Sequence, residues 1–587
     1  MKRTISKVLL AAVSMAVILS SCSKTPDQSR YVPKTASIVI DLNAKQLTTK
    51  LVTNGITMDK LFNAAEKDTA NEVMKAWKDA ENSGIDLQSH FFAAVVLQGQ
   101  PSEKKSYVSI TGHLKDADKF EAYLKKTVTD FSQQTQNDFK YIWDNREQAV
   151  IGWTKSTVIY LHPMDLSNLD RLNPGGSGFP APGGSDPNTP ADSIMPVALL
   201  TKEDDAKTWV AEVDHLFHLK KEETATTIEP FAKLLKKDAD AGVFVNADAV
   251  LNSGTLPLVP ANVKKLLEGT SYTSTINFEN GKVIFDGDTY MGKEVAAIYK
   301  KYGKKEINMD MLKQYPSENV VGFISYAFDF HLIGELIKAT GMDGLVNIMI
   351  TGRSGLSMDD ILNAFDGELT FVASDFTIEK QEYMPGEFTQ KPSLKWIFNM
   401  KVGNKDAIDK VMSSPMFKEV FTKQGDRYII VNPMAAAILP PLSVTDKFVT
   451  LGSDSLLLQQ YLAGKGNIKL PNGVESKVKG TMLGGYIDLE KMTANIPEEG
   501  VDTDQVKILH DVKQLFKDFI ITSKADGGDI QHSEAVLTFK NKDQNSLVQL
   551  INFSAAAAKM VKEKQAKTKA YEDSLFGVPV DTAVAPQ

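Results

Sequence analysis

Cysteine is almost absent from this chain, since Cys22 is its only cysteine among 587 residues. A disulfide within one chain needs two cysteines, so the sequence excludes the disulfide framework that staples many small secreted domains. Thiol catalysis by any other residue is excluded as well, because the remaining chain holds no thiol. What Cys22 does must therefore be decided from its surroundings.

An excess of positive charge is also lacking, because the formal net charge is −8. Nucleic-acid-binding proteins usually show a basic patch, so we expect no nucleic-acid partner. The same balance argues against broad electrostatic adhesion to anionic lipid. With 42% hydrophobic and 24% charged residues the composition is that of a globular protein, and the length predicts several core-forming units.

Common catalytic motifs are missing. The chain contains no G-x-S-x-G elbow and no G-x-G-x-x-G fingerprint. The segment Gly287–Glu294 nearly matches a phosphate-binding loop, but Glu294 stands where Ser or Thr would hold Mg²⁺. It also follows a predicted antiparallel hairpin instead of a parallel strand. We therefore expect no nucleotide, no other cofactor and no bound metal.

The N-terminus has the pattern of a bacterial signal peptide. Lys2, Arg3 and Lys7 precede an apolar stretch, Val8–Leu19, which is too short to span a bilayer comfortably. The following Leu19-Ser20-Ser21-Cys22 resembles a lipobox. That resemblance implies a signal peptide over residues 1–21, cleavage after Ser21, and a diacylglycerol and palmitate-type acyl chain on Cys22. We thus expect Cys22 to be a lipidation site and the membrane to be a partner through this anchor.

The residues after Cys22 are polar, and we expect a tether over residues 22–31 with no packing role. Its single acidic residue, Asp27, does not resemble the acidic surface-export signals of Bacteroidota lipoproteins. The expected location is the cell envelope, at the periplasmic face of the outer membrane.

Self-similarity is the most informative feature of the remaining chain. Four sequence patterns recur in the same order. Each begins with a strand-like run and most continue through a polar cap into an apolar helical stripe. The pairs are Ser37–Leu42 with Val320–Ser325, Phe91–Leu97 with Leu369–Ala373, Tyr107–Ile110 with Trp396–Met400, and Val158–Leu161 with Phe448–Leu451. Asp116 and Asn404 are expected N-caps in equivalent places.

Each half also closes on a matching strand, helix and hairpin. Gly242–Asp248 resembles Gly484–Glu490, and the hairpin after the first contains Asn280-Gly281, which favours a type I′ turn. Chance matching of alternating apolar runs is the alternative to duplication.

These patterns predict an α+β fold with mainly antiparallel sheets, interposed helices and two similar halves from an internal duplication. The expected halves are residues 32–310 and 311–560. A Gly/Pro-rich mobile loop over residues 173–192 belongs to the first half alone, and residues 561–587 form the end of a helix and a disordered tail.

Few side chains suggest chemistry. His215 and His218 share a helical face, but no third ligand lies nearby, so a solvated surface is favoured over a metal site. The acidic pairs Asp238/Asp240 and Asp502/Asp504 match no calcium loop. Core packing is favoured for the tryptophans over a sugar platform, although Trp143 and Trp153 are expected to be neighbours, and Met309–Met311 is also assigned to packing.

The lipobox, the opening Tyr31–Leu42 and the run after Ser83-Gly84-Ile85-Asp86 together resemble a family of Bacteroidota envelope lipoproteins of unknown function. The resemblance spans nearly the whole mature chain and implies no functional residues. We therefore expect a non-enzymatic, membrane-anchored protein that binds an envelope protein or a glycan ligand through its duplicated scaffold. The alternative is a hydrolase that acts on glycans or peptides with carboxylates dispersed along the chain.

Overall fold

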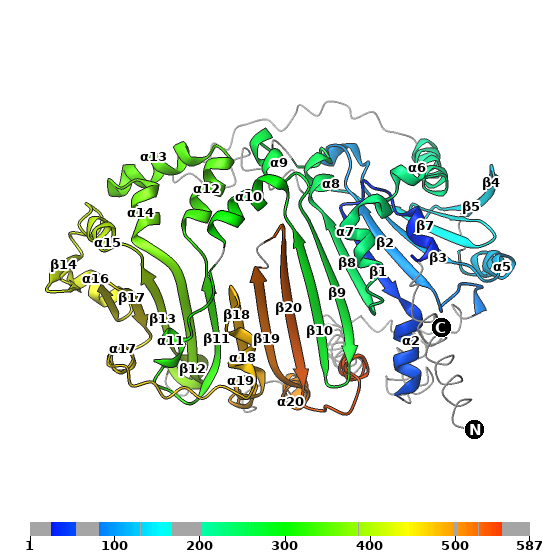
Figure 1. Ribbon diagram of the computed structural model, residues 1–587. Coiled ribbons are helices and arrows are strands. Elements are labelled where there is room, and N and C mark those ends of the chain that lie inside the picture. Colours follow the sequence, from blue (N-terminus) through cyan, green and yellow to red (C-terminus); the bar gives the residue numbers. More distant parts are fainter. Residues whose placement is uncertain are drawn as a thin grey trace, which may run out of the picture. The chain divides into compact units, whose positions relative to one another are not determined.

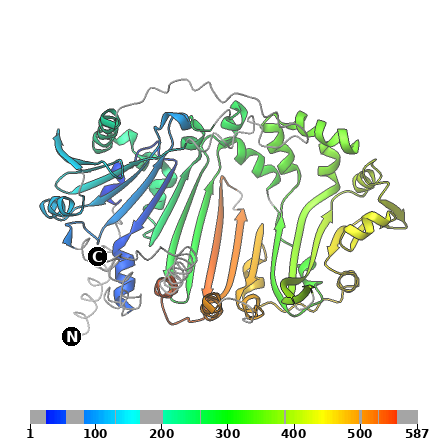
Figure 2. The same cartoon turned by 180° about the vertical axis from the view of Figure 1, so that it is seen from behind.

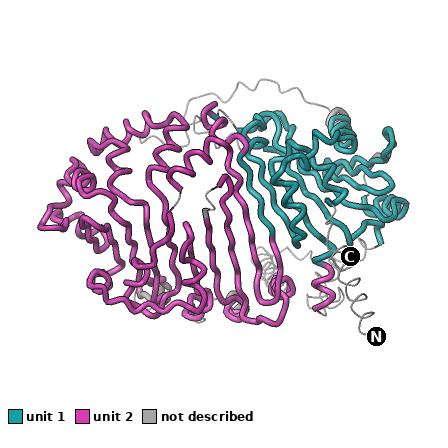
Figure 3. Tube along the Cα trace, viewed as in Figure 1, with its two compact units in different colours: residues 1–47, 80–259, 270–275 teal, residues 48–79, 260–269, 276–587 magenta. Residues whose placement is uncertain are grey.

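The computed structural model describes residues 25–54, 82–128, 131–166, 202–256, 259–303, 305–384, 387–497, 503–525 and 528–554. Cys22, the loop at 173–192 and the C-terminal segment from residue 555 lie outside these ranges. The contacts between residues divide the chain into two units (Figure 3). Unit 1 comprises residues 1–47, 80–259 and 270–275, and unit 2 comprises residues 48–79, 260–269 and 276–587.

The strands of unit 1 form an antiparallel sheet (Figure 1). Burial alternates along β1, as expected for a strand with one covered face, but the buried residues are Val39, Asp41 and Asn43, whereas Ile38, Ile40 and Leu42 are more exposed. The order of neighbouring strands is β8 (Ala241–Asn246), β1 (Ile38–Asn43), β2 (His90–Val96), β3 (Tyr107–His113), β7 (Thr157–Pro163), β6 (Ala149–Trp153), β5 (Phe139–Asp144) and β4 (Phe131–Gln136).

Aromatic side chains dominate the core of unit 1. Phe92, Tyr107, Trp209 and Phe244 belong to one buried cluster. In a second cluster, Trp153 packs edge-on against Phe120. The helices of this part are η1 (Asp27–Tyr31), α2 (Ala44–Thr53, which crosses into unit 2), η2 (Pro101–Glu103), α5 (Ala117–Thr127), α6 (Lys202–Phe217), η4 (Lys221–Glu223), η5 (Ala225–Thr227), α7 (Glu229–Leu234) and α8 (Ala247–Asn252).

Unit 2 is also built on antiparallel strands. Its order is β10 (Lys282–Tyr290), β20 (Ile530–Phe539), β19 (Phe516–Ala525), β18 (Leu483–Asp488), β11 (Val320–Ala327), β12 (Phe365–Met384), β13 (Glu387–Val402), β17 (Phe448–Gly452), β16 (Leu442–Thr445), β15 (Arg427–Ile430) and β14 (Phe421–Gln424). From β18 to β14 this order repeats that of unit 1 from β8 to β4, strand for strand.

The helices of unit 2 lie mainly at the two ends of its strands. In Figures 1 and 2, α12 and α13 lie at one end, and α18 to α20 lie at the other. Their bounds are α9 (Ala261–Leu267), α10 (Lys293–Tyr302), α11 (Asp310–Lys313), α12 (His331–Ala339), α13 (Asp343–Ser354), α14 (Met358–Ala364), α15 (Lys405–Met412), α16 (Pro433–Ile438), α17 (Ser455–Leu462), α18 (Val474–Val478), α19 (Leu489–Ala494) and α20 (Thr503–Leu515).

The expected α+β class with antiparallel sheets is confirmed, and so are the helix caps. The Asp116 carboxylate accepts a hydrogen bond from the Lys119 amide at 3.0 Å, and the Asn404 side chain accepts one from Ala407 at 3.0 Å. Each cap satisfies an amide that has no partner within its helix, α5 or α15.

The tether is shorter than the sequence predicted. We expected residues 22–31 to lack packing, but Asp27–Tyr31 forms the 3-10 helix η1 and buries Gln28, Ser29 and Tyr31. The adjoining chain is fixed by a hydrogen bond from the Lys34 amide to the Glu223 carbonyl at 2.7 Å. The buried Ser29 hydroxyl is satisfied within the segment, since it donates a hydrogen bond to the Pro26 carbonyl at 2.7 Å, so a polar sequence can still pack here.

The boundary between the halves and one turn also differ from expectation. Strand β9 (Ser271–Glu279) pairs with β10, and β10 pairs along its length with β20, so the chain from residue 276 joins unit 2 instead of dividing after 310. In the β9–β10 turn Gly281 takes a φ of +66°, but Asn280, which bridges to Asn545, is not among the described non-glycine residues with a positive φ. A type I′ turn needs a positive φ at both residues, so this turn is of another type.

Candidate functional site

Helix α13 is apolar on two opposite sides. Ile350 packs against a buried cluster of unit 2, while Leu345, Ile348 and Met349 are 55%, 72% and 66% exposed. Their spacing of three and four residues places the exposed side chains on one helical face. A surface helix normally presents charged and polar residues on the face opposite its buried one. The exposed face of α13 is therefore a candidate docking surface.

Local sequence fixes this helix at both ends. Gly341 before it and Gly355 after it take φ values of +72° and +71°, which suit glycine and end regular helix. Asn347 holds α13 against the following helix, because its side-chain oxygen accepts a hydrogen bond from the Met358 amide at 2.8 Å. A side chain added at Gly344 would meet nothing within 4 Å. The exposed face is thus presented on a positioned helix.

A second apolar surface lies on α16. Met434 and Ile438, one helical turn apart, are 77% and 78% exposed. The helix is started by Asn432, whose side-chain oxygen accepts hydrogen bonds from the Met434 and Ala435 amides. Proline at its first position suits a helix start. Single exposed apolar side chains need no explanation, but grouped ones commonly mark interaction sites.

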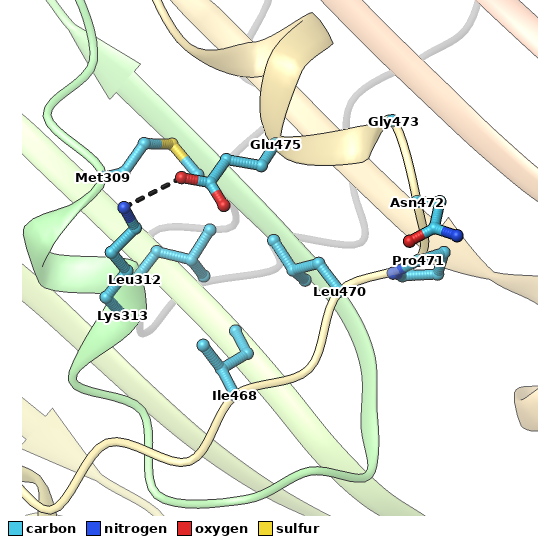
Figure 4. Close-up of a pocket in the computed structure, with 9 residues that line it drawn as sticks. All are labelled: Met309, Leu312, Lys313, Ile468, Leu470, Pro471, Asn472, Gly473 and Glu475. Carbon is cyan, nitrogen blue, oxygen red and sulfur yellow. Dashed lines mark ion pairs between the residues drawn. The ribbon is translucent and has the colours of Figure 1, made fainter.

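A small pocket opens beside α11 and α18 in unit 2 (Figure 4). It encloses about 290 Å³, and its lining is mostly apolar: Met309, Leu312, Lys313, Ile468, Leu470, Pro471, Asn472, Gly473 and Glu475. Met309 and Leu312 belong to the buried core, against which Ile468 and Leu470 also pack. The pocket is therefore a gap at the edge of the core.

The charged residues of this pocket neutralise each other. Lys313 Nζ lies 2.8 Å from a Glu475 oxygen, as Figure 4 shows. The hydrogen bond to Glu475 raises the pKa of Lys313. A general base needs a pKa near the working pH, whereas this lysine is held protonated. The geometry supports packing and ion pairing at the pocket and provides no acid–base pair.

The histidines noted in the sequence do not form a convergent group. His215 lies 3.6 Å from Glu212 on α6. His218 lies between Asp214 at 3.2 Å and Asp138 at 3.3 Å. The Asp214 backbone carbonyl raises the pKa of His218 by accepting its hydrogen bond, and the Asp138 charge adds to this effect. Both rings are about half exposed, as expected for a solvated surface.

Trp143, Trp153, Met309 and Met311 lie in the core, Trp396 is only partly buried, and Trp77 lies outside the described residues. Trp143 and Trp153, on the neighbouring strands β5 and β6, are 4% and 2% exposed. Met309 and Met311 are also buried. Core packing is thus confirmed for these residues over a sugar-stacking platform.

The near match to a phosphate loop has the wrong geometry. Gly287 lies within β10, whose neighbour β20 is antiparallel, and α10 begins at Lys293. Glu294 instead pairs with Lys265 at 3.1 Å. Of the acidic pairs, Asp240 is fully buried and Asp238 takes a φ of 42°, whereas Asp502 lies outside the described residues. Sequence reasoning missed α13, although its run of apolar residues on both faces was a usable signal.

Within the described ranges, no helix combines the length and apolar character needed to cross a membrane. This applies to the helices on which the candidate surfaces lie. Cys22, the expected lipidation site, is not among the described residues.

Residues 29–174 match a family model described as a domain of unknown function (DUF4836). This part of the chain is therefore similar to an uncharacterised family, over a shorter span than the sequence resemblance suggested. No curated protein matches the chain.

Solved structures with some likeness are crystal forms of TP0453. Form IV has a TM-score of 0.23 at 5% identity, covering 47% of this chain and 84% of that one. Form III has a TM-score of 0.22 at 8% identity, covering 48% of this chain and 88% of that one. Scores this low carry no argument about fold or function.

Proposed function

We propose that this chain is a non-enzymatic lipoprotein of the cell envelope that binds another envelope protein through the apolar face of α13. The anchor would be acyl chains on Cys22, and the location the periplasmic face of the outer membrane. The observation that carries the proposal is the exposure of Leu345, Ile348 and Met349 on a helix whose other face is packed. The lipid anchor rests on the lipobox resemblance and the solitary cysteine.

A protein partner is favoured over a lipid surface by charge. The chain carries a net charge of −8, and α13 itself begins with Asp343. Membrane-surface helices are usually rich in Lys and Arg on their polar face, whereas α13 has the single basic residue Arg353. Apolar contact with another protein requires no such basic residues.

The anchor is tested by Cys22→Ala in cells fed radiolabelled palmitate. The wild-type protein should incorporate label and the variant should not. The matched control is Ser20→Ala, which alters the lipobox at a position that accepts small residues and should still be labelled. Equal labelling of wild type and Cys22→Ala would overturn the anchor.

The docking surface is tested by photo-crosslinking in intact cells. Benzoylphenylalanine at Ile348 should give a discrete protein adduct, whereas the same group at exposed Lys418 should not. Adducts to lipid alone, or equal adducts at both positions, would contradict a protein partner. Because this readout uses no label on Cys22, failure of the docking surface is distinct from failure of the anchor.

We also propose that the two units descend from an internal duplication. The strand order from β8 to β4 and from β18 to β14 supports this, as do the caps Asp116 and Asn404. An experimental structure should let β1, β2 and β3 superpose on β11, β12 and β13 in one rigid alignment. Failure of that alignment would leave a shared strand order without common descent.

A further inference from the structure

Three metal-ligating side chains meet on one face of the β10–β20 pair in unit 2. Asp286 and Asp288 are two residues apart on β10, so both project from the same face of the sheet. His532 on β20 lies directly opposite Asp288 in the antiparallel register. Side chains directly opposite each other on neighbouring strands are within reach, so the pairing brings the three together.

The distances place the imidazole between the two carboxylates. His532 Nδ1 lies 2.9 Å from Asp288 Oδ1, and Nε2 lies 3.6 Å from Asp286 Oδ2. One ligand atom from each residue lies within 4.8 Å of the other two. Among the described residues this is the one group of three or more His, Cys, Asp or Glu that converges in this way.

The burial of the group suits a bound ion that stays open to solvent. The Asp288 side chain is 14% exposed, whereas those of Asp286 and His532 are 34% and 37% exposed. A divalent cation here could take one oxygen from each carboxylate and one nitrogen from the imidazole.

Neighbouring strands add one further donor and one competing cation. Glu534 lies opposite Asp286 in the same register, and Lys524 on β19 lies opposite His532. Glu534 could supply a fourth oxygen ligand, whereas the Lys524 ammonium would disfavour a cation and so lowers the expected affinity.

We propose that Asp286, Asp288 and His532 bind a divalent transition-metal ion, with Zn²⁺ as the best-suited ion. One imidazole nitrogen with two carboxylate oxygens is a ligand set that Zn²⁺ accepts, whereas Mg²⁺ and Ca²⁺ prefer oxygen alone. Three protein ligands leave one tetrahedral position for water or Glu534. The ion would join two strands whose ligands are 244 residues apart in the chain, and would stabilise the folded unit by binding it selectively.

The test uses the full chain, freed of metal with a chelator and titrated with ZnCl₂ in a calorimeter. The wild type should bind one Zn²⁺ with a dissociation constant in the micromolar range or below. His532→Ala and Asp288→Asn should each weaken binding by at least about 100-fold. Even substitution of a residue that only hydrogen-bonds to a metal ligand typically lowers metal affinity by about 10–100-fold. His218→Ala is the matched control, because His218 also lies between two aspartates but forms no convergent group.

A second readout keeps the proposal falsifiable if a variant folds poorly. Co²⁺ added to the wild type should give a visible ligand-field spectrum that Zn²⁺ removes, and Asp286→Asn should weaken it. The melting temperature of the wild type should rise with Zn²⁺, and that of His532→Ala should not. Equal Zn²⁺ affinity in wild type and His532→Ala, or no binding at a Zn²⁺ concentration about 100 times a micromolar dissociation constant, would overturn the proposal.

Discussion

The two units share a strand order but treat their apolar side chains differently. In the described part of unit 1 no large hydrophobic side chain is more than 42% exposed. In unit 2, Ile348, Met434 and Ile438 are 72–78% exposed. The scaffold is therefore not what distinguishes the units. The difference lies in what is presented on that scaffold.

One of these surfaces lies where the two connections differ. In unit 1, β5 and β6 are joined by the short turn Asn145–Gln148. The corresponding connection in unit 2, between β15 and β16, holds α16 with its exposed Met434. Connections tolerate insertions because lengthening a loop adds little to the entropic cost of closing it, and because loops lie outside the core.

The units also share an ionic contact that ties a helix to the following hairpin. In unit 1 the Glu121 carboxylate on α5 lies 2.6 Å from both Lys125 and Lys140. In unit 2 Asp409, at the equivalent fifth position of α15, accepts hydrogen bonds from Lys423 and from Tyr428. Each of these two contacts can be removed by a single substitution within its own unit.

The largest expected effect is on the aromatic core of unit 1. Trp153→Ala removes a side chain that is 2% exposed and should cost about 3–5 kcal/mol of unfolding free energy. Trp396→Ala in unit 2 should cost less, because Trp396 is only partly buried. Urea unfolding followed by hydrogen exchange of peptides from each unit would measure both. An equal loss in the two units would remove the contrast between their cores.

The ionic contacts predict a pH dependence. Hydrogen bonds from Lys125, Lys140 and Gln133 lower the pKa of Glu121 from 4.5 to about 2. Burial opposes ionisation of Asp409, but hydrogen bonds from Lys423 and Tyr428 outweigh it and lower its pKa as well.

A carboxyl group whose pKa is lower in the folded than in the unfolded state stabilises the folded protein at pH values above its unfolded-state pKa. That stabilisation is lost as the pH falls through its folded-state pKa. Glu121→Gln should therefore lose about 1 kcal/mol at pH 7, and its difference from the wild type should shrink between pH 4.5 and 2. Asp409→Asn should show the same trend below pH 3.8. Urea midpoints measured across this range check both, and a difference that stays constant with pH would contradict the ionic explanation.

The equivalent helix caps should have similar effects. Asn246→Ala at α8 and Asp488→Ala at α19 each remove a side-chain acceptor of a helix-terminal amide, at 3.4 Å and 2.9 Å. Each should cost about 1 kcal/mol. Asn246→Asp and Asp488→Asn retain an acceptor and serve as controls. A large cost from one cap and none from the other would show that the two closing strands are not equivalent.

The smallest expected effect sharpens the contrast in exposure. Ile348→Ser on α13 should change unfolding free energy by less than about 0.5 kcal/mol, because the side chain is 72% exposed. Val39→Ser on β1, where the valine is fully buried, is the comparison and should cost far more. Melting temperatures of both variants decide the point. A strong loss in Ile348→Ser would mean that α13 is covered within the protein.

Local sequence determined the elements of this protein. Short apolar runs specified the strands from Ile38 to Asn43 and from Val320 to Ala327, though not which face of each is buried, and polar caps specified where α5 and α15 begin. These features depend on neighbours a few residues away, so they can be read directly. The lipid anchor at Cys22 also rests on local sequence and stays a prediction.

Tertiary structure alone decided the rest. The assignment of β10 to unit 2, the conformation of the Asn280–Gly281 turn and the meeting of Asp288 with His532 all depend on pairing with the C-terminal segment. Two aspartates two residues apart on a strand, such as Asp286 and Asp288, are common and by themselves indicate no site. They become part of a possible site only because the fold places His532, 244 residues further along the chain, opposite Asp288. Strand register, which is set by the burial of whole sheet faces, is the physical reason that this meeting cannot be read from local sequence.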